Sequence, residues 1–290
     1  MKIFFLGTNG WFATRTGNTV CAAILADGGI AGALRPRNSR ANGGRLIVLD
    51  AGDGFQHVPA LMARLGVSSA DVFLSHLHID HIGGLHTLPL LPRGARVRVF
   101  AHKSYLPALK RFVAHPYTAT PSEQWAKVTL HPLSTGENKV HSAASGPGAR
   151  ARRQAYLVQV LPLDHADPCF GFRFSLGGKE IAYCTDTGPC KNISILARNA
   201  DALITECALL PGAGELKGWP HLSPEMAARE AKKAGAKRLI LTHFDARKYP
   251  ALRLRAAAQK AARKIFPRTV AARDGMELEI KSQPARSRTE

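Results

Sequence analysis

The sequence is short of acidic residues. Its 290 residues contain 21 Asp and Glu against 40 Lys and Arg, which gives a formal net charge of +19 at pH 7. This balance excludes an acidic disordered chain, and a hydrophobic content of 45% excludes a basic disordered tail. A chain of this length and composition can bury one large core or two small ones.

Long apolar runs and paired cysteines are also lacking. No apolar stretch approaches the roughly 18–20 residues that cross a bilayer. The first apolar residues, 3–6, run straight into the turn sequence Gly7-Thr8-Asn9-Gly10, too early for a secretory signal. Five cysteines, an odd number without CxxC spacing, do not indicate a disulfide framework. We therefore expect a soluble, cytoplasmic protein without membrane partners, and we leave a homodimer open.

The positive charge is concentrated in four segments that contain no acid. Residues 28–49, 81–122, 138–154 and 246–273 hold four, six, four and nine Lys or Arg residues. A field of this kind concentrates polyanions at a surface, which favours a phosphate-bearing substrate over a merely solubilising surface. Residues 28–44 have the composition of a long basic loop, and we expect residues 135–148, rich in Ser, Gly and Ala, to be mobile.

Short apolar runs bounded by turn residues predict buried strands. They cover residues 2–6, 45–49, 72–74, 97–101, 156–163, 201–205 and 238–242, with a further strand starting within 123–130 and a hairpin over 170–185 that turns at Gly177-Gly178. Ser223-Pro224-Glu225 predicts the start of a helix that ends at Gly235, and residues 250–266 predict a basic helix. The pattern predicts an α/β sandwich in one domain, residues 1–280, followed by a disordered basic tail, residues 281–290.

Four predicted strands end in acidic or metal-binding residues. They read VFLSHLHIDH, IAYCTD, ALITE and LILTH, and ligands collect outside the carboxyl ends of strands in open α/β folds. Side chains two apart in an extended segment lie about 6.6 Å apart on one side, so His76 and His78 can hold one metal ion. Asp80 and His81 follow where the chain turns, at Gly83-Gly84, and can hold a second ion about 3.5–4 Å away.

Two ions need further ligands. His165, Asp186 and His243 follow other predicted strands, and a carboxylate can bridge two cations while a His completes each ligand set. Mixed His and Asp ligands favour Zn²⁺, with Mn²⁺ and Fe²⁺ as alternatives. Six other histidines lack this position, and we interpret them as structural: His57, His86, His102, His115, His131 and His141.

The order HxHxDH, then a His, an Asp and a final His, resembles the metallo-β-lactamase superfamily over essentially the whole chain. Within it the sequence resembles ribonuclease Z and related phosphodiesterases at Gly7–Gly10, at Asp50-Ala51-Gly52 and over residues 201–206 and 221–249. The resemblance implies an αββα sandwich of two mixed β-sheets with helices outside. It also implies that His76, His78 and His165 hold one zinc, that Asp80, His81 and His243 hold the other, and that Asp186 bridges both.

The chemistry implied is that of a two-zinc phosphodiesterase. Two dications lower the pKa of a bridging water, and the resulting hydroxide attacks a phosphodiester of RNA or of a small cyclic phosphate. The leaving oxygen needs a proton, which His221, oriented by Glu206, can supply as general acid. We therefore predict Asp80, His221 and Glu206 as catalytic residues.

The sequence departs from ribonuclease Z in two places. That family carries a tRNA-gripping arm between its third metal His and its bridging Asp, but here only the 20 residues 166–185 lie there and the predicted hairpin uses them. This spacing is closer to phosphodiesterases that open small cyclic phosphates. Residues 13–18, ATRTGN, also stand where the family has Pro-Thr-x-x-Arg-Asn.

Two other functions stay open. One is thioester or lactam hydrolysis within the same superfamily, against which the basic field argues. The other is a non-catalytic, metal-stabilised nucleic-acid-binding protein that uses the Arg-rich loops and the helix at 250–266, against which the complete ligand set argues.

Overall fold

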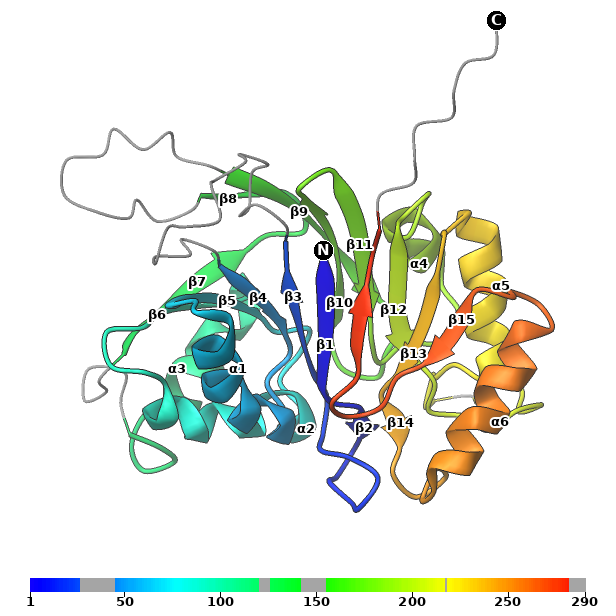
Figure 1. Ribbon diagram of the computed structural model, residues 1–290, viewed down its shortest axis with the longest axis horizontal. Coiled ribbons are helices and arrows are strands. Elements are labelled where there is room, and N and C mark those ends of the chain that lie inside the picture. Colours follow the sequence, from blue (N-terminus) through cyan, green and yellow to red (C-terminus); the bar gives the residue numbers. More distant parts are fainter. Residues whose placement is uncertain (27–44, 120–125, 142–154, 217, 282–290) are drawn as a thin grey trace, which may run out of the picture.

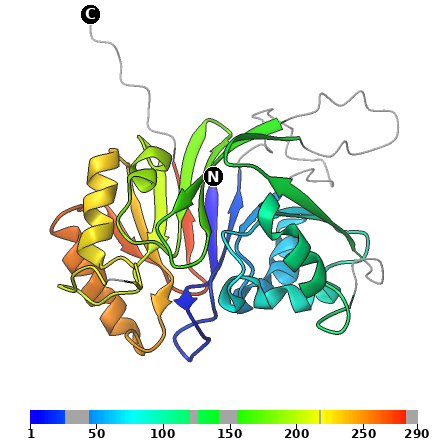
Figure 2. The ribbon, with the colours of Figure 1, turned by 180° about the vertical axis from the view of Figure 1, so that it is seen from behind.

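In a computed structural model of the chain, two seven-stranded β-sheets lie face to face with helices on both outer sides (Figures 1 and 2). The structure describes residues 1–26, 45–119, 126–141, 155–216 and 218–281. No helix in these ranges is long and apolar enough to cross a membrane. The predicted loop at 28–44 and nearly all of the predicted tail at 281–290 lie outside the described residues.

Both sheets are mixed. The strand order in the first is β16 (Glu277–Glu279), β1 (Lys2–Gly7), β3 (Cys21–Leu25), β4 (Leu46–Leu49), β5 (Ser69–Phe73), β6 (Arg96–His102) and β7 (Lys127–Leu133), antiparallel as far as β4 and parallel beyond it. In the second it is β15 (Thr269–Ala271), β13 (Leu239–Thr242), β12 (Ala202–Glu206), β11 (Lys179–Cys184), β10 (Cys169–Leu176), β9 (Ala155–Leu163) and β8 (Gly136–His141), parallel as far as β11 and antiparallel beyond it.

Helices cover the outer face of each sheet, which confirms the predicted αββα sandwich (Figure 1). The first sheet carries η1 (Asp53–His57), α1 (Val58–Leu65), α2 (Ile79–Ile82), η2 (Gly83–Leu90), η3 (Lys103–Tyr105) and α3 (Leu106–Phe112), and the second carries α4 (Lys191–Leu196), α5 (Pro224–Ala234) and α6 (Leu252–Arg263). A short parallel pair, β2 (Asn9–Gly10) and β14 (Phe244–Asp245), joins the two halves at one edge.

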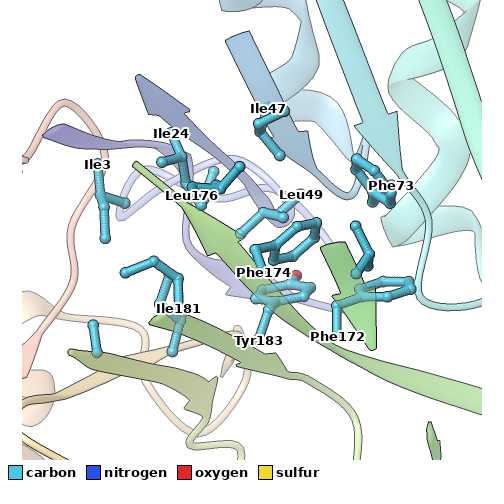
Figure 3. Packing of buried hydrophobic residues seen from close by; sticks show 14 of the residues in the cluster. Ile3, Ile24, Ile47, Leu49, Phe73, Phe172, Phe174, Leu176, Ile181 and Tyr183 are labelled. Carbon is cyan, nitrogen blue, oxygen red and sulfur yellow. The ribbon is translucent and has the colours of Figure 1, made fainter. Parts of the chain in front are cut away.

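Alternation along the strands divides the apolar side chains between three layers. In β1, Ile3 and Phe5 face the other sheet while Phe4 faces the helices, and in β11 Ile181 and Tyr183 face inward. Figure 3 shows the inner layer, in which side chains of both sheets interdigitate: Ile3, Ile24, Ile47, Leu49 and Phe73 from the first, and Phe172, Phe174, Leu176, Ile181 and Tyr183 from the second. Each fully buried side chain of this size contributes about 1.5–3 kcal/mol of hydrophobic free energy.

Local sequence signals account well for several elements. Gly177-Gly178 turns the β10–β11 hairpin with both residues at positive φ. The side chain of Ser223 caps α5 at the amide of Met226, and Gly235 ends the helix in the left-handed conformation, as predicted. The expectation of a mobile segment at 135–148 is wrong for residues 136–141, which form β8. This edge strand is held by pairing with β9 and by the buried Val140, contacts that lie outside any local pattern.

Asp71 on β5 is buried between the sheets and binds two arginines and a tyrosine. Arg45 donates to it at 2.6 Å, Arg98 donates twice, at 2.7 and 2.6 Å, and the Tyr156 hydroxyl donates at 2.7 Å. Burial and the charge of Asp71 raise the pKa of Tyr156, so the phenol keeps its proton. Because Arg45 and Arg98 form internal pairs, the predicted field of surface cations is wrong for these two residues.

We predict that Asp71→Ala lowers the free energy of unfolding by about 3–5 kcal/mol, because it leaves the buried Arg45 guanidinium unpaired. Urea denaturation measures the change. The matched control is Glu277→Ala, which removes an ion pair at the surface: the side chain of Arg64 is 58% exposed and that of Glu277 36%. This change should lower the free energy of unfolding by less than about 1 kcal/mol. Equal small losses in both variants would contradict this account of the inner ion pairs.

Candidate metal centre

The strands β5, β11 and β13 end at the edge where β2 pairs with β14 (Figure 1). Histidine and aspartate side chains converge at this edge. The segment after β5 supplies the HxHxDH residues, with His78 in extended backbone at the start of α2. Glycine is needed at position 84 for close packing, because a Cβ there would collide with the carbonyl oxygen of Gly52. Gly84 is not in the left-handed backbone conformation. The start of η2 therefore lies directly against the Asp50-Ala51-Gly52 segment.

All seven predicted metal ligands lie in this cluster. His76, His78, His165 and Asp186 form one group and Asp80, His81 and His243 a second, and within each group one donor atom per residue lies within 4.8 Å of the others. Asp186 contacts both groups. One carboxylate oxygen lies 3.7 Å from His76 Nε2, and the other lies 3.4 Å from His81 Nε2 and 3.0 Å from His243 Nε2.

Asp50 orients His81. Its carboxylate, fully buried, accepts hydrogen bonds from His81 Nδ1 at 2.9 Å, from the Ser75 amide and hydroxyl, and from the Tyr183 hydroxyl at 2.7 Å. Because Nδ1 of His81 carries the donated proton, its Nε2 is left to face the cluster. The motif residues Asp50-Ala51-Gly52 were recognised from the sequence, but this role of Asp50 depends on the folded contacts.

Asp167, whose role was not predicted from the sequence, orients the two histidines of the cluster that are partly exposed. Its carboxylate accepts from His78 Nε2 at 2.8 Å, and its backbone carbonyl lies 3.1 Å from His165 Nδ1. The two rings lie 5.1 Å apart between centroids. Its position two residues after His165 is the one signal in the sequence that could have identified it, because carboxylates often fix the ring orientation of ligand histidines.

The donor set fits metal ions. Within the described part of the chain, the buried Nε2 of His76 has no hydrogen-bond partner, and burial together with His81 lowers the pKa of His76, which leaves that nitrogen a free lone pair. Burial alone would raise the pKa of Asp186, but His243 and His81 lower it, so the carboxylate stays ionised. Burial lowers the pKa values of His81 and His243, but Asp186 outweighs burial and raises both. Because neutral imidazole and carboxylate are the forms that bind divalent cations, these two rings release their protons when metal binds.

The backbone is strained where it presents these groups. Asp50, Asp186 and His243 have φ of 55°, 51° and 49°, the left-handed region that non-glycine residues seldom adopt. A Cβ on Gly10 would collide with the ring of His243, so glycine there lets β2 pack against this ligand. Such strain gathers at functional sites, where surrounding contacts hold it in place.

Glu206 and His221, predicted as catalytic residues, form a buried pair beside the cluster. His221 Nδ1 donates to Glu206 at 2.7 Å, and the backbone amides of Thr187, Ala208 and Leu222 also donate to this carboxylate. Burial and the charge of Lys248 lower the pKa of His221. The carboxylates of Glu206 and Asp186 outweigh both effects and raise this pKa to about 9. At neutral pH His221 is therefore a cation with a proton to give.

A cavity of about 390 Å³ opens beside this pair. Its lining includes the ligand His165 and the acid candidate His221, together with Asp164, Glu215 and Pro220. A substrate group held in this cavity would lie within reach of both residues.

Comparison with known proteins places the chain in a family. The family model described as Beta-lactamase superfamily domain matches residues 45–244. Ribonuclease Z of Lacticaseibacillus casei is 30% identical, with 98% of each chain covered, and ribonuclease Z of Bacillus licheniformis is 28% identical, with 97% of this chain and 99% of that protein covered.

Solved structures agree in fold. The metallo-β-lactamase fold protein YhfI from Bacillus subtilis superposes with a TM-score of 0.69 at 17% identity, over 96% of this chain and 98% of that one. The short form of human tRNase Z superposes with a TM-score of 0.64 at 21% identity, over 97% of this chain and all of that one. The chain therefore belongs to the metallo-β-lactamase superfamily, as a hydrolase that within it resembles ribonuclease Z.

Proposed function

We propose that this hydrolase is a two-zinc phosphodiesterase that acts on RNA or on a small cyclic phosphate. The observation that carries the proposal is the pair of ligand groups that meet at Asp186, next to the charged His221. In this assignment His76, His78 and His165 would hold one ion, Asp80, His81 and His243 would hold the other, and Asp186 would serve both. Zinc suits such a mixed set of imidazole and carboxylate donors.

Two such cations, when bound, supply an activated water at neutral pH and positive charge for the phosphoryl oxygens. The chain's own residues prepare the site for them. Asp50 and Asp167 hold the imidazole rings in one tautomer and one orientation. The Trp11 amide, which donates to Asp80 at 2.7 Å, fixes that carboxylate. Little rearrangement is then needed when substrate binds.

His221 is the general acid in this mechanism. Its Nδ1 proton is committed to Glu206, so the proton for the leaving oxygen comes from the opposite nitrogen, Nε2. Glu206 is a positioning residue, since it keeps His221 protonated and fixes the plane of its ring. Four donors hold Glu206 in turn, which makes the pair rigid.

The short connection from His165 to Asp186 favours a small substrate. Strands β10 and β11 occupy residues 169–176 and 179–184, so this stretch is part of the second sheet. The ribonuclease Z relatives support RNA as the substrate, whereas the absence of an arm within the described residues 166–185 supports a small cyclic phosphate or an RNA end.

The function is tested with a panel of chromogenic substrates. We predict that the zinc-loaded protein hydrolyses bis-p-nitrophenyl phosphate and leaves a cephalosporin and a glutathione thioester intact. A protein that hydrolyses the cephalosporin or the thioester but not the phosphodiester would instead be a lactam or thioester hydrolase of the same superfamily. Tight, salt-sensitive RNA binding without hydrolysis of any substrate would favour the nucleic-acid-binding alternative.

Asp80→Ala is expected to reduce the metal content of the purified protein from about two equivalents to about one, because it removes a ligand from one group only. We expect kcat/KM for bis-p-nitrophenyl phosphate to fall at least ~100-fold, as charge stabilisation by the second ion is lost. Elemental analysis and kinetics are measured on the same sample, with Glu277→Ala as a control that changes neither. An Asp80→Ala protein with two ions and full activity would refute the ligand assignment.

The pH profile tests His221. Its pKa of about 9 predicts that kcat/KM for a diester with an alkyl leaving group falls as pH rises through about 9, because the acid form is lost. Glu206→Gln removes the charge that raises the pKa, so this limb should shift toward the ordinary value of about 6.5 or below. A nitrophenyl ester, whose leaving group needs little protonation, should show a weaker limb. An unchanged profile in Glu206→Gln would eliminate the general-acid role.

A further inference from the structure

Trp11 is a large aromatic residue that the fold leaves in solvent. It follows β2 directly and is 55% exposed, although side chains of this kind normally bury most of their surface. Its φ of 77° is in the left-handed region, which is costly for a residue with a bulky side chain. Neither burial nor backbone preference explains a tryptophan at this position.

The surroundings of Trp11 join it to the metal centre. Its amide donates to the Asp80 carboxylate at 2.7 Å, so its backbone is one hydrogen bond from a proposed metal ligand. The pairing of β2 with β14 brings the segment after Phe244 alongside, and Ala246 donates to the Gly10 carbonyl. These contacts fix the backbone of Trp11 at the rim of the site.

Arg247 lies over the indole. Its guanidinium carbon is 5.3 Å from the ring centroid, which is within the range of a cation–π contact. The neighbouring Phe12 meets the same ring edge to face at 5.4 Å between centroids and is itself 40% exposed. Arg247 and Phe12 therefore contact the indole ring, while much of its surface stays open to solvent.

Other exposed apolar side chains lie close to the site. Ile79, between two proposed ligands, is 64% exposed, and Trp219, whose ring centroid is 5.7 Å from that of His221, is 55% exposed. A substrate consisting of phosphate alone would have no use for such side chains. Exposed aromatic rings beside a cation are the combination that binds unpaired nucleobases, because every base has a face that can stack.

We propose that Trp11, supported by Arg247, is a base-stacking subsite, so that the substrate carries an unpaired nucleobase next to the phosphate held at the metal centre. This inference rests on the proposed phosphodiesterase function and narrows its substrate to nucleotides or single-stranded RNA. Trp11 is a specificity residue in this assignment: it binds the base, and the metal ligands and His221 act on the phosphate.

The test measures binding, so it does not depend on turnover. Calorimetric titration of the zinc-loaded protein compares 5′-AMP with ribose 5-phosphate, which has the same sugar and phosphate but no base. We expect the wild type to bind 5′-AMP at least ~5-fold more tightly, from the usual strength of one stacked base. Trp11→Leu, which keeps an apolar side chain but removes the aromatic face, should abolish this preference, and Trp11→Phe should retain part of it.

Tyr117→Ala is the control, because Tyr117 is an aromatic residue, 68% exposed, in the turn region after α3. It should leave the preference unchanged. A wild type that does not prefer 5′-AMP, or a Trp11→Leu variant that keeps the full preference, would overturn the subsite. Failure of the proposed function is seen separately: a protein that loses base preference in Trp11→Leu but hydrolyses no phosphodiester would keep the subsite and lose the catalytic assignment.

Discussion

A single buried carboxylate, Asp50, joins the two sheets to the metal centre. It accepts hydrogen bonds from Ser75 at the end of β5, from Tyr183 on β11 of the opposite sheet, and from the proposed ligand His81. Burying a carboxyl group costs free energy unless several hydrogen bonds satisfy it. The same carboxylate thus links the two sheets and turns His81 Nε2 toward Asp186 and His243. The packing of the sheets and the geometry of the site therefore share these contacts.

The ligand set could be predicted from the sequence because its signals are local. His76, His78, Asp80 and His81 lie within six residues, and their side chains follow from strand and turn geometry. His165, Asp186 and His243 each stand just after an apolar run, and parallel strands bring such positions to one edge. The hairpin at Gly177-Gly178 and the capped helix α5 were predictable for the same reason.

What the sequence could not provide depends on contacts between distant segments. Asp167 reaches His78 across 89 positions, and Trp11 meets Asp80 across 69. The strand β8 has a polar, loop-like composition and forms because β9 pairs with it. The charge count also misleads, since Arg45 and Arg98 are bound to Asp71 between the sheets and Arg255 is 2% exposed. A net charge of +19 therefore overstates the charge available to a substrate.

The most direct test of the central claim is zinc titration of the metal-stripped protein, with hydrolysis of bis-p-nitrophenyl phosphate followed at each addition. Two adjoining ligand groups that share Asp186 predict that activity rises until about two equivalents are bound and then stays constant. Full activity at one equivalent, or two bound equivalents without hydrolysis, would contradict the two-ion phosphodiesterase.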